Sequence, residues 1–417
     1  MNNQHTPNSL NLLSAFAVCA SGLEDVLLAE LRTFDGLEFI KKNKGGVKFS
    51  SNPKNICRLN LWSRIPSRIL IQLGKTQITN SDELLDFALR IDWEQWFTPF
   101  DTFRIDVNYT GSMPKSISAN YAALKFKDGI CDRFRSKFNN KRPSVNTKNP
   151  DVRIWIHFVN SLVTVSIDTS GEPLFKRGWR ESKGIAPIKE NLVSGLLSMT
   201  NWNMTQPLLD PMCGSGTFVI EAMQKFAKLP ANFIPNKVRK FACENFSDAS
   251  PFKTVEWEVL RNEALDVWQD QDKIRDFPQV IGTDASAEMI KISKNNASMA
   301  LPEKIAESII WEVSDFCDVN TALVQDLSPG ILVTNPPFGT RINFIESSKI
   351  KFIEELGTIL KKNFPKWTAW VLTDEKKFSS IIRLKHTQKF PVFNGDISCN
   401  WLSFEMVAGT MKKTNGS

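Results

Sequence analysis

The sequence predicts an α/β protein in which an α+β region precedes a mainly parallel sheet covered by helices. Three observations support this prediction. Beyond residue 191, short runs that are apolar on both faces alternate with helices, as in a buried parallel sheet. Before residue 170, strands that alternate apolar and polar residues accompany three helical segments. Between these regions, residues 171–190 form a connector rich in Gly, Pro and charge.

Length and composition favour two or three domains in a soluble, cytoplasmic protein. The chain has 417 residues, a net charge of +7 and 42% hydrophobic residues. The positive charge suits a polyanionic partner, although many cytosolic proteins reach it without one. Seven dispersed cysteines without a C-x-x-C pair argue for free thiols. Three histidines lie far apart in the sequence, so no metal is expected.

The first region reads as strand, helix, strand, helix, strand over residues 12–73, after a polar segment 1–11 that is expected to be disordered. Residues 12–20 imitate a signal peptide, but no Lys or Arg precedes them, so a buried strand is favoured. No apolar run approaches the about 18–20 residues that span a bilayer. A second α+β unit runs from about 77 to 170, with a helix at 119–137 and strands at 103–109, 153–158 and 162–168.

The region from residue 191 to 417 is predicted to hold the parallel sheet. Its strands are expected at 207–209, 280–282, 309–313, 330–333 and 369–373. The first strand leads into a glycine-rich turn, Asp210-Pro211-Met212-Cys213-Gly214-Ser215-Gly216-Thr217, and then a helix. Such a turn lets a ligand approach the backbone and presents free N–H groups at the helix start. A tight turn that merely needs two glycines is the alternative.

The turn differs from two well-known phosphate-binding loops. Val219 occupies the third small position of a dinucleotide fingerprint, and no Gly-Lys-Ser/Thr follows as in a phosphate loop. Asp210 directly before the turn would repel phosphates and would favour a cationic ligand, such as the ammonium group of a methionine moiety.

Two further acidic residues follow the next strands. Asp284 ends the strand at 280–282 and can accept hydrogen bonds from both ribose hydroxyls of an adenosine, or can cap the helix at 286–297. The spacing from Gly214 implies that residues 229–278 are an insertion or extra helices. Asp315 follows the strand at 309–313 and could accept a hydrogen bond from an adenine amino group.

The fourth site, Asn335-Pro336-Pro337-Phe338, is the most informative. Two prolines hold the chain extended and remove backbone donors while keeping carbonyl acceptors. The Asn335 side chain and the Pro336 carbonyl can therefore receive both hydrogens of an exocyclic amine, and Phe338 offers a face on which a displaced base can stack. A loop made rigid by two prolines is the alternative.

Together with residues 184–190 (GIAPIKE), these motifs closely resemble the THUMP-containing guanosine N2-methyltransferases. The similarity covers nearly the whole chain. It implies a ferredoxin-like region over 12–73, a THUMP RNA-binding domain over 57–168 and a Rossmann-like class I methyltransferase domain over 191–417. It also implies S-adenosylmethionine as cofactor, with Asp284 at the ribose, Asp315 at the adenine, and Asn335 to Phe338 at the target guanine. The expected remaining cofactor contacts are Ala186, Pro187, Glu190, Asp210, Met212, Cys213, Gly214, Ser215, Gly216 and Thr217.

Two departures from the family pattern matter. Phe338 stands where many relatives have Tyr. The chain stops at Ser417, whereas some relatives are fused to a second methyltransferase that forms 7-methylguanine, so that second activity is expected to be absent.

Basic residues are consistent with structured RNA as partner, although each could equally lie on a solvated helix face. The expected RNA contacts are Lys125, Arg133, Arg135, Lys137, Lys141, Arg142, Lys176, Arg177, Trp179, Arg180 and Arg341, with Trp179 available for stacking. The leading hypothesis is N2-methylation of a guanosine in 23S rRNA, during subunit assembly, with no membrane and no obligate protein partner. The alternatives are a tRNA guanosine N2-methyltransferase, a DNA adenine N6-methyltransferase, and a catalytically silent RNA-binding assembly factor.

Overall fold

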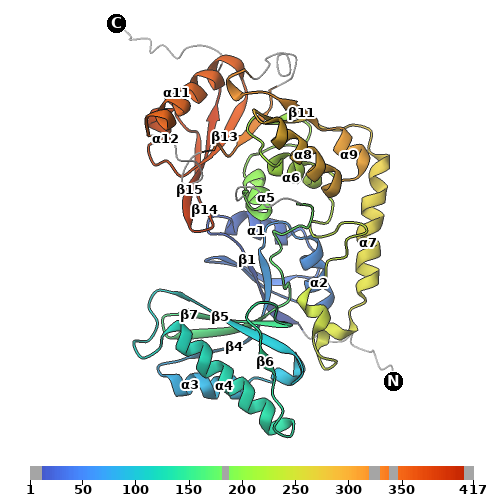
Figure 1. The fold of residues 1–417 in the computed structure, drawn as a ribbon, viewed down its shortest axis with the longest axis vertical. Helices are drawn as coiled ribbons and strands as arrows, with labels where there is room; N and C mark the ends of the chain where they lie inside the picture. Colours follow the sequence, from blue (N-terminus) through green and yellow to red (C-terminus); the bar gives the residue numbers. More distant parts are fainter. Residues whose placement is uncertain (1–11, 181–186, 319–328, 338–345, 408–417) are drawn as a thin grey trace, which may run out of the picture. The chain divides into compact units, whose positions relative to one another are not determined.

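A computed structural model describes residues 12–180, 187–318, 329–337 and 346–407 (Figure 1). The chain divides into two compact units. The first comprises the described residues of Met1–Cys19, Leu28–Leu174 and Arg239–Leu260, and the second those of Ala20–Leu27, Phe175–Val238 and Arg261–Ser417. Within the described ranges, every helix is too short or too polar to cross a membrane.

The first unit is built on one eight-stranded sheet with the order β2-β3-β1-β4-β8-β7-β5-β6. β5 pairs in parallel with β6 and β7, and the other neighbours are antiparallel. The sheet is continuous across the two α+β regions that the sequence predicts. Its strands are β1 (Leu13–Val18), β2 (Glu38–Asn43), β3 (Gly46–Ser51), β4 (Arg68–Gln77), β5 (Thr102–Thr110), β6 (Ser144–Val145), β7 (Val152–Val159) and β8 (Leu162–Asp168).

Side-chain caps fix where the helices of this unit begin. Asn52, Asn80 and Ser118 each accept a hydrogen bond from a backbone N–H of the first turn that follows. The predicted helix over residues 119–137 is confirmed, whereas α3 was not expected. The helices are α1 (Glu24–Leu31), α2 (Pro53–Trp62), α3 (Ser81–Arg90), α4 (Ala119–Lys137) and the 3-10 turns η1 (Trp93–Gln95), η2 (Ala242–Asn245) and η3 (Pro251–Thr254).

Residues 239–260 pack in the first unit although they follow the glycine-rich turn in the sequence. The Cys243 N–H donates to the Thr169 carbonyl at 3.1 Å, and the Phe246 ring lies 5.7 Å from that of Trp96. The chain therefore leaves the second unit after Val238, beyond the helix that follows the glycine-rich turn, and returns through α7 (Trp257–Gln269). This excursion accounts for the long spacing between Gly214 and Asp284.

The second unit contains a seven-stranded sheet with the order β11-β10-β9-β12-β13-β15-β14. The first five are parallel, which confirms the predicted sheet, and β15 runs antiparallel to β13. The antiparallel pair β14 and β15 was not predicted. The strands are β9 (Leu208–Asp210), β10 (Val280–Asp284), β11 (Ile310–Val313), β12 (Ile331–Thr334), β13 (Thr368–Thr373), β14 (Gln388–Asn394) and β15 (Ile397–Glu405).

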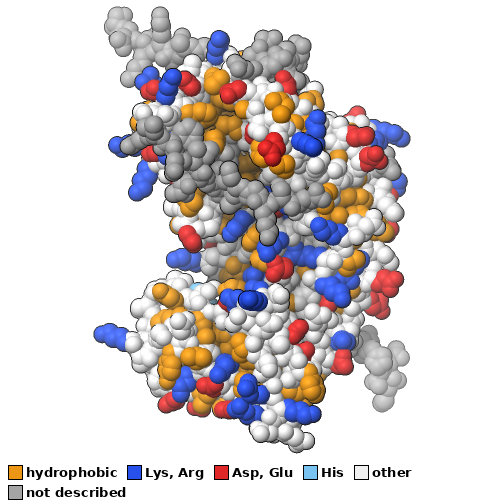
Figure 2. Space-filling model, in the orientation of Figure 1, with side chains coloured by type: hydrophobic (Ala, Val, Ile, Leu, Met, Phe, Trp, Pro, Cys, Tyr) orange, Lys and Arg blue, Asp and Glu red, His pale blue; other side chains and the backbone are white. Residues whose placement is uncertain are grey.

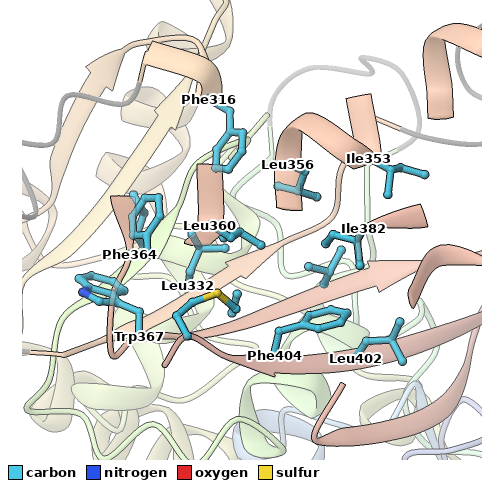
Figure 3. Close-up of a cluster of buried hydrophobic side chains, with 14 of the residues drawn as sticks. Phe316, Leu332, Ile353, Leu356, Leu360, Phe364, Trp367, Ile382, Leu402 and Phe404 are labelled. Atoms are coloured by element: carbon cyan, nitrogen blue, oxygen red, sulfur yellow. The ribbon is translucent and has the colours of Figure 1, made fainter. Parts of the chain in front are cut away.

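Helices cover this sheet and bury its apolar strands. Figure 3 shows one buried cluster, in which Leu356 and Leu360 of α11 lie over Leu332, Leu402 and Phe404 of the sheet. Burial of such side chains stabilises the fold by about 1.5–3 kcal/mol each. The helices are α5 (Glu190–Ser198), α6 (Thr217–Phe226), α8 (Ala287–Ala300), α9 (Glu303–Glu307), α11 (Glu346–Asn363), α12 (Phe378–Ile381) and the 3-10 turns η4 (Asp270–Lys273) and η5 (Phe316–Asp318).

The strand order contains a switch point at β9. β9 pairs with β10 on one side and with β12 on the other, so the chain connections run outward in opposite directions. Open parallel sheets bind ligands at the carboxyl ends of the strands at such a point. The predicted sites after β9, β10, β11 and β12 all lie at this edge.

Candidate active site

The glycine-rich turn between β9 and α6 has a backbone that only glycine adopts easily. Gly214 and Gly216 have φ angles of +51° and +81°. A Cβ on Gly216 would come 2.9 Å from the Trp311 ring, whereas a Cβ on Gly214 would meet no atom within 4 Å. Gly216 is therefore required for packing, and Gly214 faces open space where a ligand can approach.

Asp284 holds this turn in place. Its Oδ2 accepts the Gly214 N–H at 3.0 Å, and its Oδ1 accepts the Ser286 N–H at 2.9 Å. Ser286 itself caps α8, and the Ser293 hydroxyl donates to the Gly214 carbonyl at 2.6 Å. Asp284 thus joins the ends of β9 and β10, and its remaining lone pairs are left for a ligand.

Asp210 is a buried carboxylate beside Asp284. Its side chain accepts the Met212 N–H at 3.3 Å, and the described residues supply it with no ion-pair partner. Burial, together with the negative charge of Asp284, raises the pKa of Asp210 well above its ordinary value. Two neighbouring carboxylates without a cation make this end of the site favourable for a positively charged ligand.

A cavity of about 460 Å³ connects the predicted motifs. Asn335, Pro336 and Pro337, directly after β12, line it together with residues of the glycine-rich turn. Twelve of the residues predicted to contact the cofactor or the target base line the cavity: Pro187, Asp210, Met212, Cys213, Gly214, Ser215, Thr217, Asp284, Asp315, Asn335, Pro336 and Pro337. Ala186, Phe338 and Arg341 lie outside the described residues.

Two predicted cofactor residues do not line the cavity. Gly216 packs against Trp311 and Ser293, as described above. Glu190, at the start of α5, is buried, and its Oε1 lies 3.3 Å from Nε of Arg180. Burial raises the pKa of Glu190, and the charge of Arg180 opposes this shift. The structure therefore does not place Glu190 at the cavity wall, although Glu190 pairs with Arg180, which lines the cavity.

Three residues predicted to contact RNA are instead built into the second unit. Trp179 is fully buried, so the prediction that it stacks on RNA is wrong. Arg177 is buried and pairs with Glu221 at 3.2 Å. Arg180 lines the cavity and donates to the Thr217 hydroxyl at 2.8 Å and to the Ile188 carbonyl at 3.2 Å. The basic sequence around residue 177 therefore supports the cofactor pocket.

The basic residues of the first unit are largely neutralised by acidic neighbours. Arg133 pairs with Asp92 and Glu94, and Lys137 also pairs with Glu94. In Figure 2, Lys and Arg side chains over α3 and α4 are interspersed with Asp and Glu, and they form no continuous basic surface on this face. The other pairs are Lys125 with Asp82 at 3.7 Å and Arg135 with Asp132 at 2.7 Å. The prediction that Arg133 is available to RNA is wrong, because only 12% of its side chain is exposed.

Three predicted basic residues remain candidates for contact with RNA. Lys141 is exposed, and its Nζ lies 5.3 Å from the centre of the Phe100 ring, which is 79% exposed. Arg142 and Lys176 are also exposed. Phe100 was not predicted, because the sequence does not reveal that a lone aromatic residue is held outside the core.

The sequence also did not identify the cavity residues that come from elements after β12. These are Phe352 of α11, Leu372 and Thr373 of β13, Asp374, and Asn394, Ile397 and Cys399 of the β14–β15 hairpin. The glycine-rich and proline-rich motifs follow other strands, so only the three-dimensional arrangement brings these residues to the cavity. Among the described residues, no three His, Cys, Asp or Glu side chains gather in a way that could hold a metal ion.

The cavity fits S-adenosylmethionine. Its volume lies in the range of small-molecule sites. Asp210 and Asp284 favour the cationic methionine end, Gly214 leaves space beside the backbone, and Asp315 stands at the next strand end. Arg180 is the cationic side chain among the described lining residues, and it can bind the carboxylate of the cofactor.

Three family models match consecutive parts of the chain. Residues 14–70 match the RlmL ferredoxin-like domain, and residues 79–168 match the THUMP domain. Residues 177–403, more than half of the chain, match the RMKL-like methyltransferase domain. The chain belongs to the RMKL-like methyltransferase family. THUMP domains bind RNA, so an RNA is the expected substrate class of this member.

Relatives agree with this membership. The chain is 33% identical over 392 residues to a Synechocystis protein provisionally named as an RNA methyltransferase, and the match covers 94% of this chain and 96% of that protein. It is also 33% identical over 404 residues to the ribosomal RNA large subunit methyltransferase K/L of Shewanella frigidimarina, covering 96% of this chain and 54% of that protein. The chain thus spans about half the length of the K/L relatives and matches their N-terminal half.

Solved structures of similar proteins share the fold over nearly the full length. SMU.472, provisionally assigned as a methyltransferase and solved with SAH, has a TM-score of 0.78 at 26% identity, covering 96% of this chain and 99% of that chain. A Listeria monocytogenes protein described as a predicted N6-adenine-specific DNA methylase has a TM-score of 0.78 at 27% identity, covering 95% of this chain and 97% of that chain. The second unit is accordingly a Rossmann-like methyltransferase domain that uses S-adenosylmethionine.

Proposed function

We propose that this protein transfers a methyl group from S-adenosylmethionine to N2 of a specific guanosine in 23S rRNA. The observation that carries this proposal is that Asn335 and Pro336 line the same cavity as the glycine-rich turn. An amine acceptor and a cofactor site therefore share one space at the carboxyl edge of the sheet. The similarity to large-subunit rRNA methyltransferases supports the choice of RNA.

The mechanism depends on positioning. The lone pair of an exocyclic base amine is delocalised into the ring, which makes the nitrogen a poor nucleophile. The Asn335 side-chain carbonyl and the Pro336 carbonyl would accept its two hydrogens and favour a geometry in which the lone pair points along the line of transfer. The cofactor supplies an activated methyl group. The residues of this chain would bind, orient and shield the reactants while the N–CH3 bond forms and the S–CH3 bond breaks. The methylated nitrogen is then acidic and releases its surplus proton to water, so no strong base is needed.

The cofactor would be held by residues with distinct tasks. Asp210 would hold the ammonium group and Arg180 the carboxylate. Asp284 would accept from the ribose hydroxyls while keeping Gly214 in place, and Asp315 would accept from the adenine amino group. We propose that the first unit docks the RNA through a ferredoxin-like region over 12–73 and a THUMP domain over 57–168, with Lys141, Arg142 and Phe100 among its contacts.

Mass-spectrometric mapping of methylguanosine in total RNA tests this proposal. Cells that produce the wild-type protein should carry an N2-methylguanosine in 23S rRNA that is lost with Asn335→Ala. Asn203→Ala, which changes an amide outside the cavity, serves as a matched control. Loss of an N2-methylguanosine from tRNA instead would favour the tRNA alternative.

Three results would reject the proposal. An unchanged map in the presence of Asn335→Ala would contradict the role of the Asn335 segment. Loss of N6-methyladenine from DNA would favour the activity named for the Listeria relative. A catalytically silent RNA-binding factor would be indicated if the purified protein bound RNA but did not bind S-adenosylmethionine in a cofactor titration.

A further inference from the structure

Asp374 is a carboxylate at the base-binding end of the cavity, and the mechanism above does not use it. It follows β13, which pairs in parallel with β12 so that Val371 stands opposite Thr334. Asp374 lies three residues after Val371, and Pro337 lies three residues after Thr334. Both residues line the cavity. Asp374 therefore stands beside the segment that would hold the target amine.

The surroundings of Asp374 leave its oxygens available. The nearest cation is Lys349 on α11, whose Nζ lies 3.9 Å from Asp374 Oδ1 but donates to Glu375 Oε2 at 2.9 Å. Glu375 also accepts the Lys377 N–H at 3.0 Å. The neighbouring Glu375 is thus engaged in local structure. No described residue donates a hydrogen bond to the Asp374 carboxylate, which is 29% exposed at the cavity wall.

A carboxylate at this position distinguishes guanine from adenine by chemistry alone. Guanine presents N1–H as a donor directly beside its N2 amine. Adenine presents a lone pair at N1, which a carboxylate repels. A site built to receive a hydrogen bond disfavours a base that cannot donate it, because the carboxylate then loses its partner and faces the N1 lone pair.

We propose that Asp374 is the residue that selects guanine, by accepting the N1–H of the target base while Asn335 and Pro336 hold its N2 amine. This inference rests on the proposed N2-methylation. In this proposal, the residue after β13 selects the base, whereas the residues after β12 hold the amine. It also explains why one amine-holding segment can serve different bases in different enzymes, since the neighbouring strand end would read the ring nitrogen.

The test uses two short RNA hairpins that carry the nucleotide mapped by the experiment above. One hairpin has guanosine at that nucleotide, and the other has 2,6-diaminopurine ribonucleoside. Both bases present a 2-amino group, but diaminopurine has a lone pair at N1. The full-length wild-type protein should methylate guanosine with a kcat/KM about 100-fold higher than diaminopurine, given what one charge-assisted hydrogen bond and one repulsion contribute.

Asp374→Asn should reverse much of this preference, because the Asn amide can donate to the N1 lone pair. We expect kcat/KM for guanosine to fall about 10- to 100-fold, and the guanosine-to-diaminopurine ratio to fall at least about tenfold. The affinity for S-adenosylmethionine should stay within about twofold of wild type. Asp266→Asn, a change of the same kind at an exposed position of α7, should leave all three values unchanged.

Three outcomes would overturn the inference. Asp374→Asn could lower kcat/KM for both hairpins equally, which would indicate a structural role. It could also leave kcat/KM for both hairpins unchanged. Equal use of the two hairpins by the wild-type protein would reject the inference without any variant. If the wild-type protein forms no N2-methylguanosine at all, the proposed function fails, which the mapping experiment shows separately.

Discussion

Charged side chains behave differently in the cavity of the second unit and on α4 of the first. In the cavity, Asp210, Asp284 and Asp315 have no ion-pair partner among the described residues, and each of them accepts a hydrogen bond from a backbone N–H of a nearby turn. On α4, Arg133 and Lys137 are paired with acidic residues of η1 and the loop before it. The carboxylates keep lone pairs for a ligand, while these cations are already neutralised.

The difference teaches which charges indicate function. A desolvated charge without a partner is costly, so a fold keeps one where a ligand compensates it. A charged side chain that pairs with an opposite charge is explained by the fold alone. Exposed ion pairs contribute about 0–1 kcal/mol each to stability. Net charge and basic runs therefore say less about RNA contact than the pairing of each residue.

The largest expected effect is at Arg180, which lines the cavity and also forms an ion pair with Glu190. Arg180→Ala should leave the buried Glu190 without its cation and destabilise the second unit by about 3–5 kcal/mol. It should also weaken S-adenosylmethionine binding at least about tenfold, through loss of the carboxylate contact. Chemical denaturation and calorimetric titration measure the two effects.

Arg135→Ala on α4 is the matched control for Arg180→Ala. Its pair with Asp132 is exposed, so the change should cost less than about 1 kcal/mol and leave cofactor binding intact. Equal losses of stability in the two variants would contradict the proposed difference between charged side chains in the cavity and those on α4.

The second largest effect is the pH dependence of cofactor binding that Asp210 is expected to cause. Its pKa is raised in the free protein by burial and by Asp284, and a bound cation favours the ionised form. S-adenosylmethionine binding should therefore release protons and strengthen as pH rises above the ordinary carboxyl pKa of 3.8, by up to about tenfold per pH unit until Asp210 is ionised in the free protein. Calorimetry in two buffers of different ionisation enthalpy measures the released protons. Asp210→Asn should bind more weakly at pH 7 and show no such release; a similar release in that variant would assign it to another group.

The smallest effect concerns the first unit. Hydrogen bonds from Arg133 and Lys137 lower the pKa of Glu94 to about 2, so its ionised form is favoured in the folded state. The stability it contributes is present above the ordinary pKa of 4.5 and is lost as pH falls toward 2. Glu94→Gln should therefore unfold more easily than wild type at pH 7 but not at pH 2. Near-ultraviolet circular dichroism follows the transition, and Asp132→Asn should behave like wild type.

The sequence predicted the parallel strands and the motifs at their ends because backbone chemistry imposes them. Gly214 needs a positive φ, Pro336 and Pro337 exclude hydrogen-bond donors, and apolar runs mark buried strands. Asp374 and Phe352 could not be found in this way. Neither has a local signal, and both reach the cavity only through strand order and helix packing.

The basic segment around Arg177 is a case in which a sequence pattern predicted a contact that the structure does not support. Its charges suggested RNA contact, but the structure buries Trp179 and pairs Arg177 with Glu221. The acidic partner lies 44 residues away in the sequence, so no local pattern reveals it. The insertion between Gly214 and Asp284 was expected, whereas the packing of residues 239–260 in the first unit was not.

One measurement tests the central claim most directly. The purified protein is incubated with protein-free large-subunit rRNA and S-adenosylmethionine carrying a deuterated methyl group, and the RNA is digested to nucleosides for mass spectrometry. We predict labelled N2-methylguanosine from the wild-type protein, and a loss of at least about 100-fold with Asn335→Ala although that variant still binds the cofactor. Label on adenosine, on ribose or on a ring carbon, or full activity of Asn335→Ala, would contradict the account.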